Sequence, residues 1–470
     1  MTIDRALFPS YEPDSTGISR REFLKRAGSM SIAAMGMGGA ASTLASCGFA
    51  GGAGTGSSSG SASLSFWQFY APGGGDKAQT QWFIDTVNTW NKNNKTQIKL
   101  EYIPTADYIG GSKLQTAFAS GQGPDIFIIS PGDFLRYYNG GVLQDLTPYI
   151  DKASQADFYS DVMGTRLVDG KIYAVPMEVE PMAMYYSVDA FEKAGLSEKD
   201  IPQTWDALLE VAAKLKTSKR YGIVFETSPG YYQNFTWYPF MWQTGADAVD
   251  PTTKKSGFNS DGVVQALQFW QDAIKRGLAP RTPLGGGGSD VLANLAAGYC
   301  AIQNVGIWGI SALRANAPNF KYGVFKLPLP PGGSYKTILG GWAFVANAKG
   351  KNPEDAAKFC AWALASLKQD SVQRGVDWII KAKSDVGPRK SVMEEATKEG
   401  GFSQGAMQIF KNDIFPGGRG EPRYPPEVYK AISDALQACM LNGADPRRQT
   451  ESAAKTIDTF LSSYKGANIL

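Results

Sequence analysis

Residues 170–191 read GKIYAVPMEVEPMAMYYSVDAF, two apolar segments separated by a break that prolines enclose. The first segment, Lys171–Pro176, is short, and the second, Met182–Tyr186, is apolar and aromatic, so both are typical of β-strands. Because proline cannot donate to a sheet ladder, we expect the chain to change sheet between them. The stretch therefore predicts a crossover between two lobes, with Glu178 and Glu180 at the lip of a ligand site.

The composition is that of a globular protein. The 470 residues suffice for two or more domains at about 150 residues each, and 43% of them are hydrophobic. A formal net charge of +3 excludes an obvious nucleic-acid-binding or polybasic membrane-binding protein. Histidine is absent, which removes the most common general base, metal ligand and pH switch. Cys300, Cys360 and Cys439 follow no metal-binding spacing, so we expect buried small residues there, and we expect neither a metal nor a cofactor.

The amino-terminal residues predict export and anchoring. Ser19–Lys25 resembles the twin-arginine export signal, and the weakly apolar residues 27–45 suit a cleaved signal. Leu44–Cys47 matches the bacterial lipobox, which predicts a signal peptide over residues 1–46 and lipidation of Cys47; the alternative is an ordinary residue at a signal-peptidase site. Residues 47–63 are then the lipidated cysteine and a flexible Gly/Ser tether. We expect a protein held at the extracytoplasmic face of the cell membrane through Cys47.

Strand and helix patterns alternate in the following part of the chain. Ser63–Tyr70, Ile98–Ile103 and Gly123–Ile129 have strand patterns, and Gln79–Asn91 and Tyr108–Ser120 carry apolar residues at helical spacing. This alternation predicts βαβ units, hence an α/β fold with a mostly parallel sheet.

Several motifs together resemble the maltose-binding-like family of extracellular solute-binding proteins of ABC importers. The motifs are GKIYAVP at Gly170–Pro176, YYSVD at Tyr185–Asp189, KAGL at Lys193–Leu196, PQTWDAL at Pro202–Leu208 and GGWAFV at Gly340–Val345. The resemblance extends over about residues 63–465 and implies a two-lobed α/β fold of the periplasmic-binding-protein type. It implies crossovers near 178, 340 and 392, with one lobe formed by 64–178 and 340–392 and the other by 179–339 and 393–470.

The resemblance also implies a function. Members of this family capture a carbohydrate, a mono- or oligosaccharide, in the cleft between the lobes by hinge closure, and they deliver it to the permease subunits of an ABC transporter. The chain would then be a binding protein and not an enzyme, monomeric, with a small sugar as ligand and no nucleic-acid partner.

Candidate ligand residues are those that complement a sugar, which offers hydroxyls at its edge and C–H groups on its faces. Some follow predicted strands, where open α/β sheets bind ligands, or match family positions; others come from the aromatic cluster 231–242. The candidates are Tyr70, Asp133, Glu178, Glu180, Tyr232, Trp242, Trp308 and Trp342. Each has a structural alternative: a helix N-cap for Asp133, a solvated hinge charge for the glutamates, and a core position for the aromatic residues.

Other functions remain open from the sequence. A polyamine- or peptide-binding protein of the same fold is an alternative, because carboxylates and aromatic rings also suit a cation. A ferric-ion-binding protein is another, because tyrosine pairs occur. A surface glycosidase would need two opposed carboxylates, and no catalytic signature surrounds any such pair.

Overall fold

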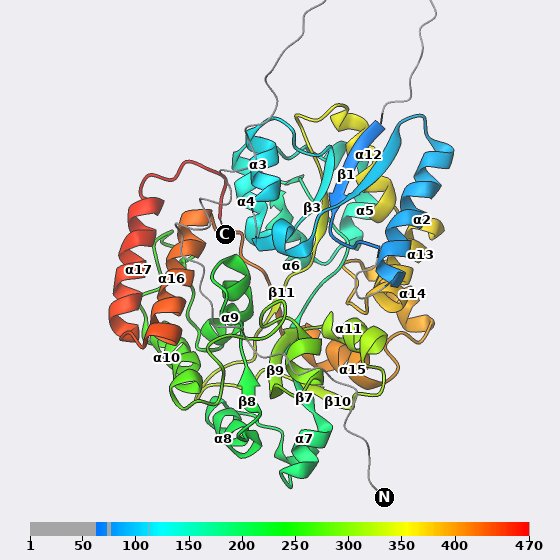
Figure 1. The fold of residues 1–470 in the computed structure, drawn as a ribbon. Coiled ribbons are helices and arrows are strands. Elements are labelled where there is room, and N and C mark those ends of the chain that lie inside the picture. Colours follow the sequence, from blue (N-terminus) through cyan, green and yellow to red (C-terminus); the bar gives the residue numbers. More distant parts are fainter. Residues whose placement is uncertain (1–62, 73–76, 111, 470) are drawn as a thin grey trace, which may run out of the picture. The chain divides into compact units, whose positions relative to one another are not determined.

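The computed structural model describes residues 63–72, 77–110 and 112–469, which belong to a compact unit spanning residues 60–470 (Figure 1). The predicted signal peptide, Cys47 and all but the last residue of the predicted tether lie outside the described residues. Within the described part, no helix has the length and apolar character needed to cross a bilayer. Cys300, Cys360 and Cys439 are buried and free, as expected.

A five-stranded sheet carries the amino-terminal strands. In spatial order it contains β2 (Gln97–Tyr102), β1 (Ser63–Gln68), β3 (Ile126–Ile129), β12 (Ala343–Ala346) and β6 (Val175–Pro176). Every residue of β3, whose sequence is IFII, is buried, as expected for a strand covered on both faces. Helices α2 and α12 pack against this sheet, and Figure 1 shows them beside β1. We call this sheet and its helices the first half.

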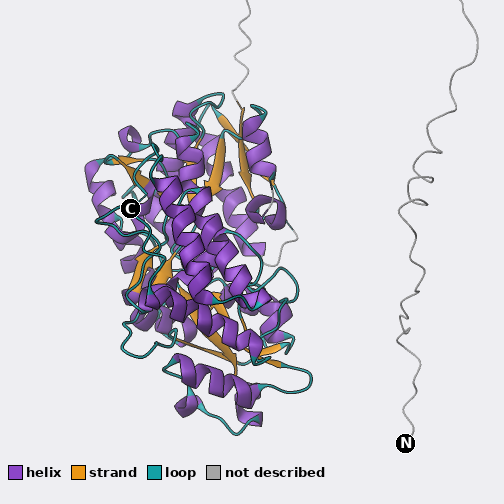
Figure 2. Ribbon diagram, turned by 90° about the vertical axis from the view of Figure 1, so that its left-hand side faces the viewer, coloured by secondary structure: helices purple, strands orange, loops and turns teal. Residues whose placement is uncertain are grey.

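A four-stranded sheet lies in the remainder of the described chain. Its order is β10 (Tyr322–Phe325), β7 (Met182–Ser187), β9 (Cys300–Gly306) and β8 (Tyr221–Val224). The residues of β7 and β9 are all buried. Helix α8 (Trp205–Leu215) packs on β8 and β9, and α9 (Tyr231–Gln243), α10 (Asp261–Lys275), α16 (Pro426–Asn442) and α17 (Pro446–Leu461) form a group of helices that pack together. We call this sheet and its helices the second half; Figure 2 shows helices flanking the strands of both halves.

The predicted helix at 79–91 corresponds to α2, whereas the predicted helix at 108–120 is divided into a π-helix, η1 (Ala106–Gly110), and α3. In chain order the α-helices are α2 (Lys77–Asn93), α3 (Lys113–Ala119), α4 (Pro131–Asn139), α5 (Lys152–Asp157), α6 (Ser160–Met163), α7 (Val188–Lys193), α8 (Trp205–Leu215), α9 (Tyr231–Gln243), α10 (Asp261–Lys275), α11 (Gly309–Asn316), α12 (Pro353–Leu364), α13 (Gln369–Val376), α14 (Lys390–Lys398), α15 (Gly405–Ile409), α16 (Pro426–Asn442) and α17 (Pro446–Leu461). A π-helix, η6 (Asp377–Ala382), continues α13. Short strand pairs join β11 (Thr337–Leu339) to β13 (Gly418–Gly420) and β4 (Leu167–Val168) to β5 (Lys171–Ile172).

The α/β architecture agrees with the sequence, but the expectation of a mostly parallel sheet was wrong. The pairs β1–β2 and β1–β3 are parallel, whereas β12 is antiparallel to both of its neighbours. In the other sheet, β7 is antiparallel to both β9 and β10. The cause is that β12 and β7 are entered directly from the other half, so no helical crossover returns the chain to a parallel direction.

The chain passes between the halves in segments that lie side by side. Residues 177–181 lead from β6 to β7, and residues 340–342 lead from β11 to β12. The Met177 N–H donates to the Trp342 carbonyl at 3.0 Å, and the Val179 N–H donates to the Val386 carbonyl at 2.9 Å. The segment beside the first crossing is therefore 384–386, a few residues before the predicted position near 392.

A substitution at Gly341 tests how tightly the two crossing segments are packed against each other. The φ of Gly341 is +110°, and a Cβ added there would lie 2.4 Å from the Glu178 carbonyl oxygen. Gly341→Ala should therefore lower the free energy of unfolding by more than about 2 kcal/mol, measured by denaturant titration. Gly332→Ala is the matched control, because φ is +69° there but nothing lies within 4 Å of the added Cβ. Equal losses in the two variants would contradict tight packing at the crossing.

Candidate functional site

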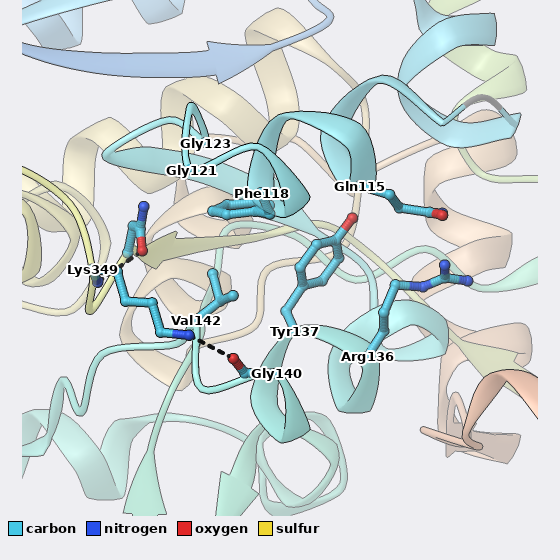
Figure 3. Close-up of a pocket in the computed structure, with 10 residues that line it drawn as sticks. Gln115, Phe118, Gly121, Gly123, Arg136, Tyr137, Gly140, Val142 and Lys349 are labelled. Atoms are coloured by element: carbon cyan, nitrogen blue, oxygen red, sulfur yellow. Dashed lines mark hydrogen bonds between the residues drawn. The ribbon is translucent and has the colours of Figure 1, made fainter.

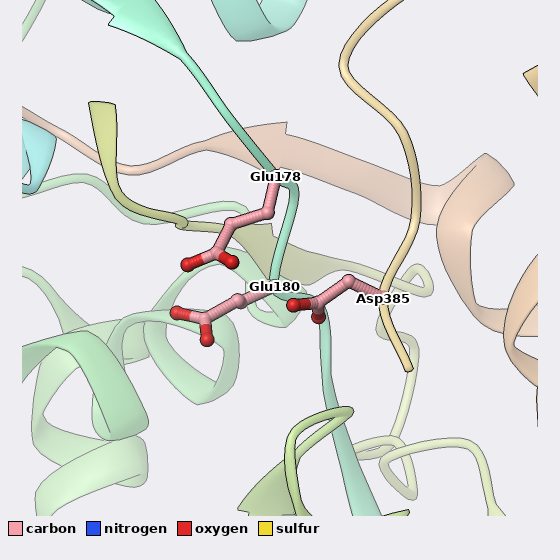
Figure 4. Close-up of side chains that lie close together, drawn as sticks. All are labelled: Glu178, Glu180 and Asp385. Carbon is pink, nitrogen blue, oxygen red and sulfur yellow. The ribbon is translucent and has the colours of Figure 1, made fainter. Parts of the chain in front are cut away.

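Carboxyl groups from the crossing segments gather around a buried lysine. Glu178, Glu180 and Asp385 are buried, with one oxygen of each within 4.8 Å of the others (Figure 4). The Lys383 Nζ lies 2.7 Å from Glu178 Oε1, 2.5 Å from Glu180 Oε1 and 3.5 Å from Asp385 Oδ2. Such a donor set fits a cation, and here the ammonium contacts all three carboxyls, so it takes the position that a metal ion would need.

Glu178 ties this cluster to the first half. Its Oε2 accepts a hydrogen bond from Trp378 Nε1 at 2.6 Å, and its Oε1 accepts one from the Trp342 backbone N–H at 3.3 Å. The Tyr70 hydroxyl donates to the same Oε1 at 3.5 Å and accepts from Lys383 Nζ at 2.9 Å. Protein donors thus occupy both oxygens of Glu178, so this side chain mainly holds the crossing segments together.

The local backbone explains why Lys383 and Asp385 reach the same cluster. The π-helix η6 ends at Ala382, and Ser384, between the two charged residues, has a φ of +70°. A left-handed conformation is unfavourable for a residue with a Cβ and persists only where the surroundings impose it. Here it turns the chain so that Lys383 and Asp385, two residues apart, both contact the carboxyl cluster.

Burial dominates the electrostatics of the cluster. Burial raises the pKa of Glu180 to about 7, and the adjacent Lys383 ammonium offsets part of the rise. Burial also raises the pKa of Asp385 well above its ordinary value. Burial by itself would lower the pKa of Lys383, but the carboxylates of Glu178 and Glu180 raise it. The lysine therefore keeps its charge at neutral pH, whereas burial and the carboxylates of Glu178 and Glu180 disfavour the charged form of Asp385.

Removing the charge of Lys383 should show how much the lysine stabilises the buried carboxyl groups. Lys383→Met leaves buried carboxyls without a cation, which we expect to lower the free energy of unfolding at pH 8 by about 3–5 kcal/mol. The folded pKa of Glu180, about 7, already lies above the ordinary 4.5. A raised carboxyl pKa destabilises the fold above that pKa, and the penalty is relieved as the pH falls through it. The deficit should thus shrink from pH 8 to pH 5 in denaturant titrations.

Lys381→Met is the matched control, since Lys381 lies two residues away with a side chain that is 60% exposed. It should change stability little at either pH. A deficit in Lys383→Met that is the same at pH 5 and pH 8 would show that the carboxyls do not cause it.

A second group of polar side chains lies at the first turn of α4. Asp133 is the third residue of α4 and pairs with Arg136 Nε at 2.6 Å. The N-cap is Ser130, so the alternative role of Asp133 as a cap does not apply. Burial raises the pKa of Asp133, and Arg136 offsets part of the rise. Asp133 and Ser130 line a cavity of about 10 Å³ together with Trp342 and with Tyr231 of the second half.

Aromatic rings approach this junction from both halves. The Tyr232 and Trp308 ring centroids lie 6.5 Å apart, and Phe235 packs against both at 5.9 and 6.3 Å. Trp342, on the other side, packs edge-on against Phe69 at 4.9 Å. Tyr232, Trp308 and Trp342 are partly exposed, so their rings could contact a solute.

Trp242 is the predicted site residue that the structure places elsewhere. It follows Tyr232 by ten residues on α9, which is about 15 Å along the helix axis. Its side chain is 3% exposed, stacked on Tyr238, and covered by the Arg419 guanidinium at 4.5 Å. Its ligand contact remains a prediction that this placement does not favour.

A known protein family matches most of the chain. The family of bacterial extracellular solute-binding proteins matches residues 74–367, which is more than half of the chain. The chain belongs to this family. Family membership makes it a solute-binding protein and not an enzyme.

Two relatives that are named for the oligosaccharide they bind are about a quarter identical in sequence to this chain. The chain is similar to the galactooligosaccharide-binding protein of Bacillus subtilis, with 25% identity over 88% of this chain and 93% of the relative. It is also similar to the arabinooligosaccharide-binding protein of the same organism, with 27% identity over 82% of this chain and 87% of the relative.

Solved structures confirm the periplasmic-binding-protein-like α/β fold. An ABC transporter solute-binding protein from Thermotoga lettingae, bound with α-D-tagatose, superposes with a TM-score of 0.72 and 21% identity, covering 85% of this chain and all of that one.

Three residues of the solute-binding protein's junction were missed from sequence. Lys383 and Asp385 lie next to Val386, which pairs with the first crossing, and Glu421 lies in a Pro/Gly-rich loop after β13. Glu421 is 2% exposed, and burial raises its pKa to about 8. The signal that could have found them is a charged residue in a loop segment that contains glycine and proline.

A larger hollow lies on the first half, away from the predicted residues. It measures about 370 Å³ and is lined by α3, α4 and the loop after β12, including Phe118, Tyr137 and Arg136 (Figure 3). The Lys349 ammonium crosses it to donate to the Gly140 carbonyl at 2.9 Å. None of the predicted ligand residues lines this hollow, and its basic side chains are engaged by the protein.

Proposed function

We propose that the chain is the carbohydrate-capturing subunit of an ABC importer. The observation that carries the proposal is a set of partly exposed aromatic rings, Tyr232 beside Trp308 in the second half and Trp342 at the second crossing, where Trp342 lines the same cavity as the polar side chains of Ser130 and Asp133. Such rings stack on the C–H faces of sugars, and the polar groups bind hydroxyls. Two relatives are named as galactooligosaccharide- and arabinooligosaccharide-binding proteins, which supports the same class of solute.

The junction favours a sugar over a polyamine. A polyamine would need free carboxylates, but the Lys383 ammonium already pairs with Glu178 and Glu180 at 2.7 and 2.5 Å. A second cation beside this ammonium would be repelled. The aromatic rings have no such competitor, so they suit a neutral ligand better than a charged one.

Capture would require the halves to separate. The cavity between them measures about 10 Å³, whereas small-molecule sites usually hold roughly 300–1,000 Å³. We infer lobes of residues 64–178 with 340–392 and 179–339 with 393–470, which rotate about the hydrogen-bonded crossing segments. A sugar that touches both lobes only when they close would shift the population to the closed form, which the permease then recognises.

Thermal unfolding of the purified protein against a panel of sugars tests the solute class. The panel contains galactobiose, arabinobiose, maltose, mannobiose and tagatose, with spermidine, amino acids and Fe(III) as controls. A sugar at 100 times its Kd should stabilise the fold by about 2.7 kcal/mol, visible as a rise in Tm. Trp308→Ala should abolish the rise, whereas Trp362→Ala, another partly exposed tryptophan but on α12, should keep it. A shift with spermidine alone would overturn the proposal for sugars.

We also infer that Cys47 is lipidated and that the protein is held at the extracytoplasmic face of the membrane. The sixteen residues after Cys47 would give a reach of roughly 20–24 Å above the bilayer. Cys47→Ala should move the exported protein from the membrane fraction to the soluble one, while Cys300→Ala, which changes a buried thiol, should not. Retention of Cys47→Ala in the membrane fraction would contradict anchoring through this residue.

A further inference from the structure

Glu421 brings a carboxyl group to the first turn of α4 at the junction of the halves. A Cβ added to Gly132, the second residue of α4, would lie 2.4 Å from Glu421 Oε1, and one added to Gly340 would lie 3.5 Å from Oε2. The carboxyl thus lies between α4 and the second crossing. Burial raises its pKa to about 8, and Arg166 and the Gly132 N–H offset part of the rise.

The surroundings of Glu421 supply little positive charge within bonding distance. Among the described residues, its carboxyl forms no ion pair, and the hydrogen-bonding group beside it is the Gly132 backbone N–H. Arg166 acts on it from a distance, because its Nη1 donates to the Val162 carbonyl at 2.6 Å and its Nη2 to the Gly341 carbonyl at 2.8 Å. The carboxyl group therefore has acceptor capacity that the protein does not use.

Ser130 gives independent support for a ligand at this place. It is the N-cap of α4 but makes no side-chain cap bond, and its Oγ is buried without a hydrogen-bond partner in the described chain. Burial raises the pKa of the neighbouring Tyr231, and the Ser130 hydroxyl offsets part of that rise. Ser130 lines the junction cavity, whose volume of about 10 Å³ is close to that of a single water.

The chemistry of these groups selects one kind of ligand atom. The first turn of a helix offers backbone N–H donors and a partial positive charge, whereas Glu421 offers acceptor oxygens. A hydroxyl both donates and accepts, so it can lie between them and satisfy both. When the halves separate, water reaches Glu421 and removes the burial that raises its pKa, so it meets a solute as a carboxylate. Closing over a ligand carboxylate would then cost repulsion or the uptake of a proton, and a ligand ammonium could not accept from α4 and would face the helix dipole and the nearby Arg166.

We propose that Glu421 is a specificity-determining residue of the solute site, which with Ser130 and the first turn of α4 binds a hydroxyl of a neutral sugar and excludes acidic and amino sugars. The inference rests on the proposed capture of a carbohydrate and adds which carbohydrates are accepted. When the halves separate, the contact between the Glu421 carboxyl and the first turn of α4 is broken. The sugar hydroxyl replaces that contact when they close.

Isothermal titration calorimetry of the purified protein tests this selectivity. The probes are galactobiose, maltose and mannobiose, with digalacturonate as the acidic counterpart and a glucosamine disaccharide as the cationic one. The unaltered protein should bind a neutral probe at least ~100-fold more tightly than either charged one. Glu421→Gln should weaken the neutral probe ~10- to 100-fold, because a hydrogen bond to a charged group is lost, and should reduce the discrimination against digalacturonate about tenfold.

Matched variants separate binding from folding. Ser130→Ala should weaken the neutral probe several-fold and change Tm little, because Ser130 Oγ makes no hydrogen bond of good geometry within the described chain and only interacts with the neighbouring Tyr231. Glu427→Gln, an exposed glutamate in the first turn of α16, should change neither affinity nor selectivity. If Glu421→Gln does not fold, as judged by circular dichroism, Glu421→Asp retracts the carboxyl by one methylene and should weaken the neutral probe similarly.

The outcomes distinguish the two proposals. If the unaltered protein binds a neutral sugar and both Glu421→Gln and Ser130→Ala keep its affinity and selectivity, the role of Glu421 is wrong while carbohydrate capture stands. If the unaltered protein prefers digalacturonate or the glucosamine disaccharide, the selectivity inferred here is also wrong. If no sugar binds the unaltered protein, carbohydrate capture is overturned, and the role of Glu421 with it.

Discussion

The constraint on which the structure depends is the burial of a lysine among carboxyl groups where the chain crosses between its halves. Moving any one of these groups out of water is costly, and it is tolerated because Lys383 lies 2.7 and 2.5 Å from the oxygens of Glu178 and Glu180. The partners come from segments that are far apart in sequence, residues 178–180 and 383–385. Folding of one crossing segment therefore requires the other to be in place. The lysine and its carboxyl partners thus hold together the segments from which both halves extend.

The same constraint distinguishes the two glutamates of the proline-bounded break. The side chain of Glu178 is completely buried and its oxygens face Trp378, Trp342, Tyr70 and Lys383, whereas the side chain of Glu180 keeps 10% of its exposure. The negative charge of Glu180 also raises the pKa of Glu421, so the two carboxyls interact at the junction. One glutamate thus supports the crossing, and the other can support it from one side and meet a solute on the other.

The sequence predicted the local features well because they depend on neighbouring residues. The alternation of patterns over residues 63–129 predicted β1, α2, β2 and β3, and the break at 177–181 predicted a change of sheet. Lys383 and Asp385 escaped prediction because their role comes from partners about 200 residues away, and no periodicity records such a pair. The burial of Trp242 escaped prediction for a related reason. The aromatic cluster 231–242 is a helix whose residues from Gln233 onward are all buried, so aromatic content there mostly reflects core packing.

Under the proposed function, the junction also constrains how a solute can enter. Its cavity of about 10 Å³ admits no sugar, so the contacts across it must break before binding while the crossing segments stay joined. The hydrogen bonds between Met177 and Trp342 and between Val179 and Val386 belong to the backbone of those segments and need not change. The contact between Glu421 and α4 is different, because it spans the junction and brings a carboxyl close to a single described backbone N–H, that of Gly132. A contact of this kind contributes little to closure without a solute, since the carboxyl gives up its hydration for one bond. A hydroxyl that satisfies both partners contributes more, and this difference between the empty and occupied junction is the free energy that can drive closure when a solute arrives.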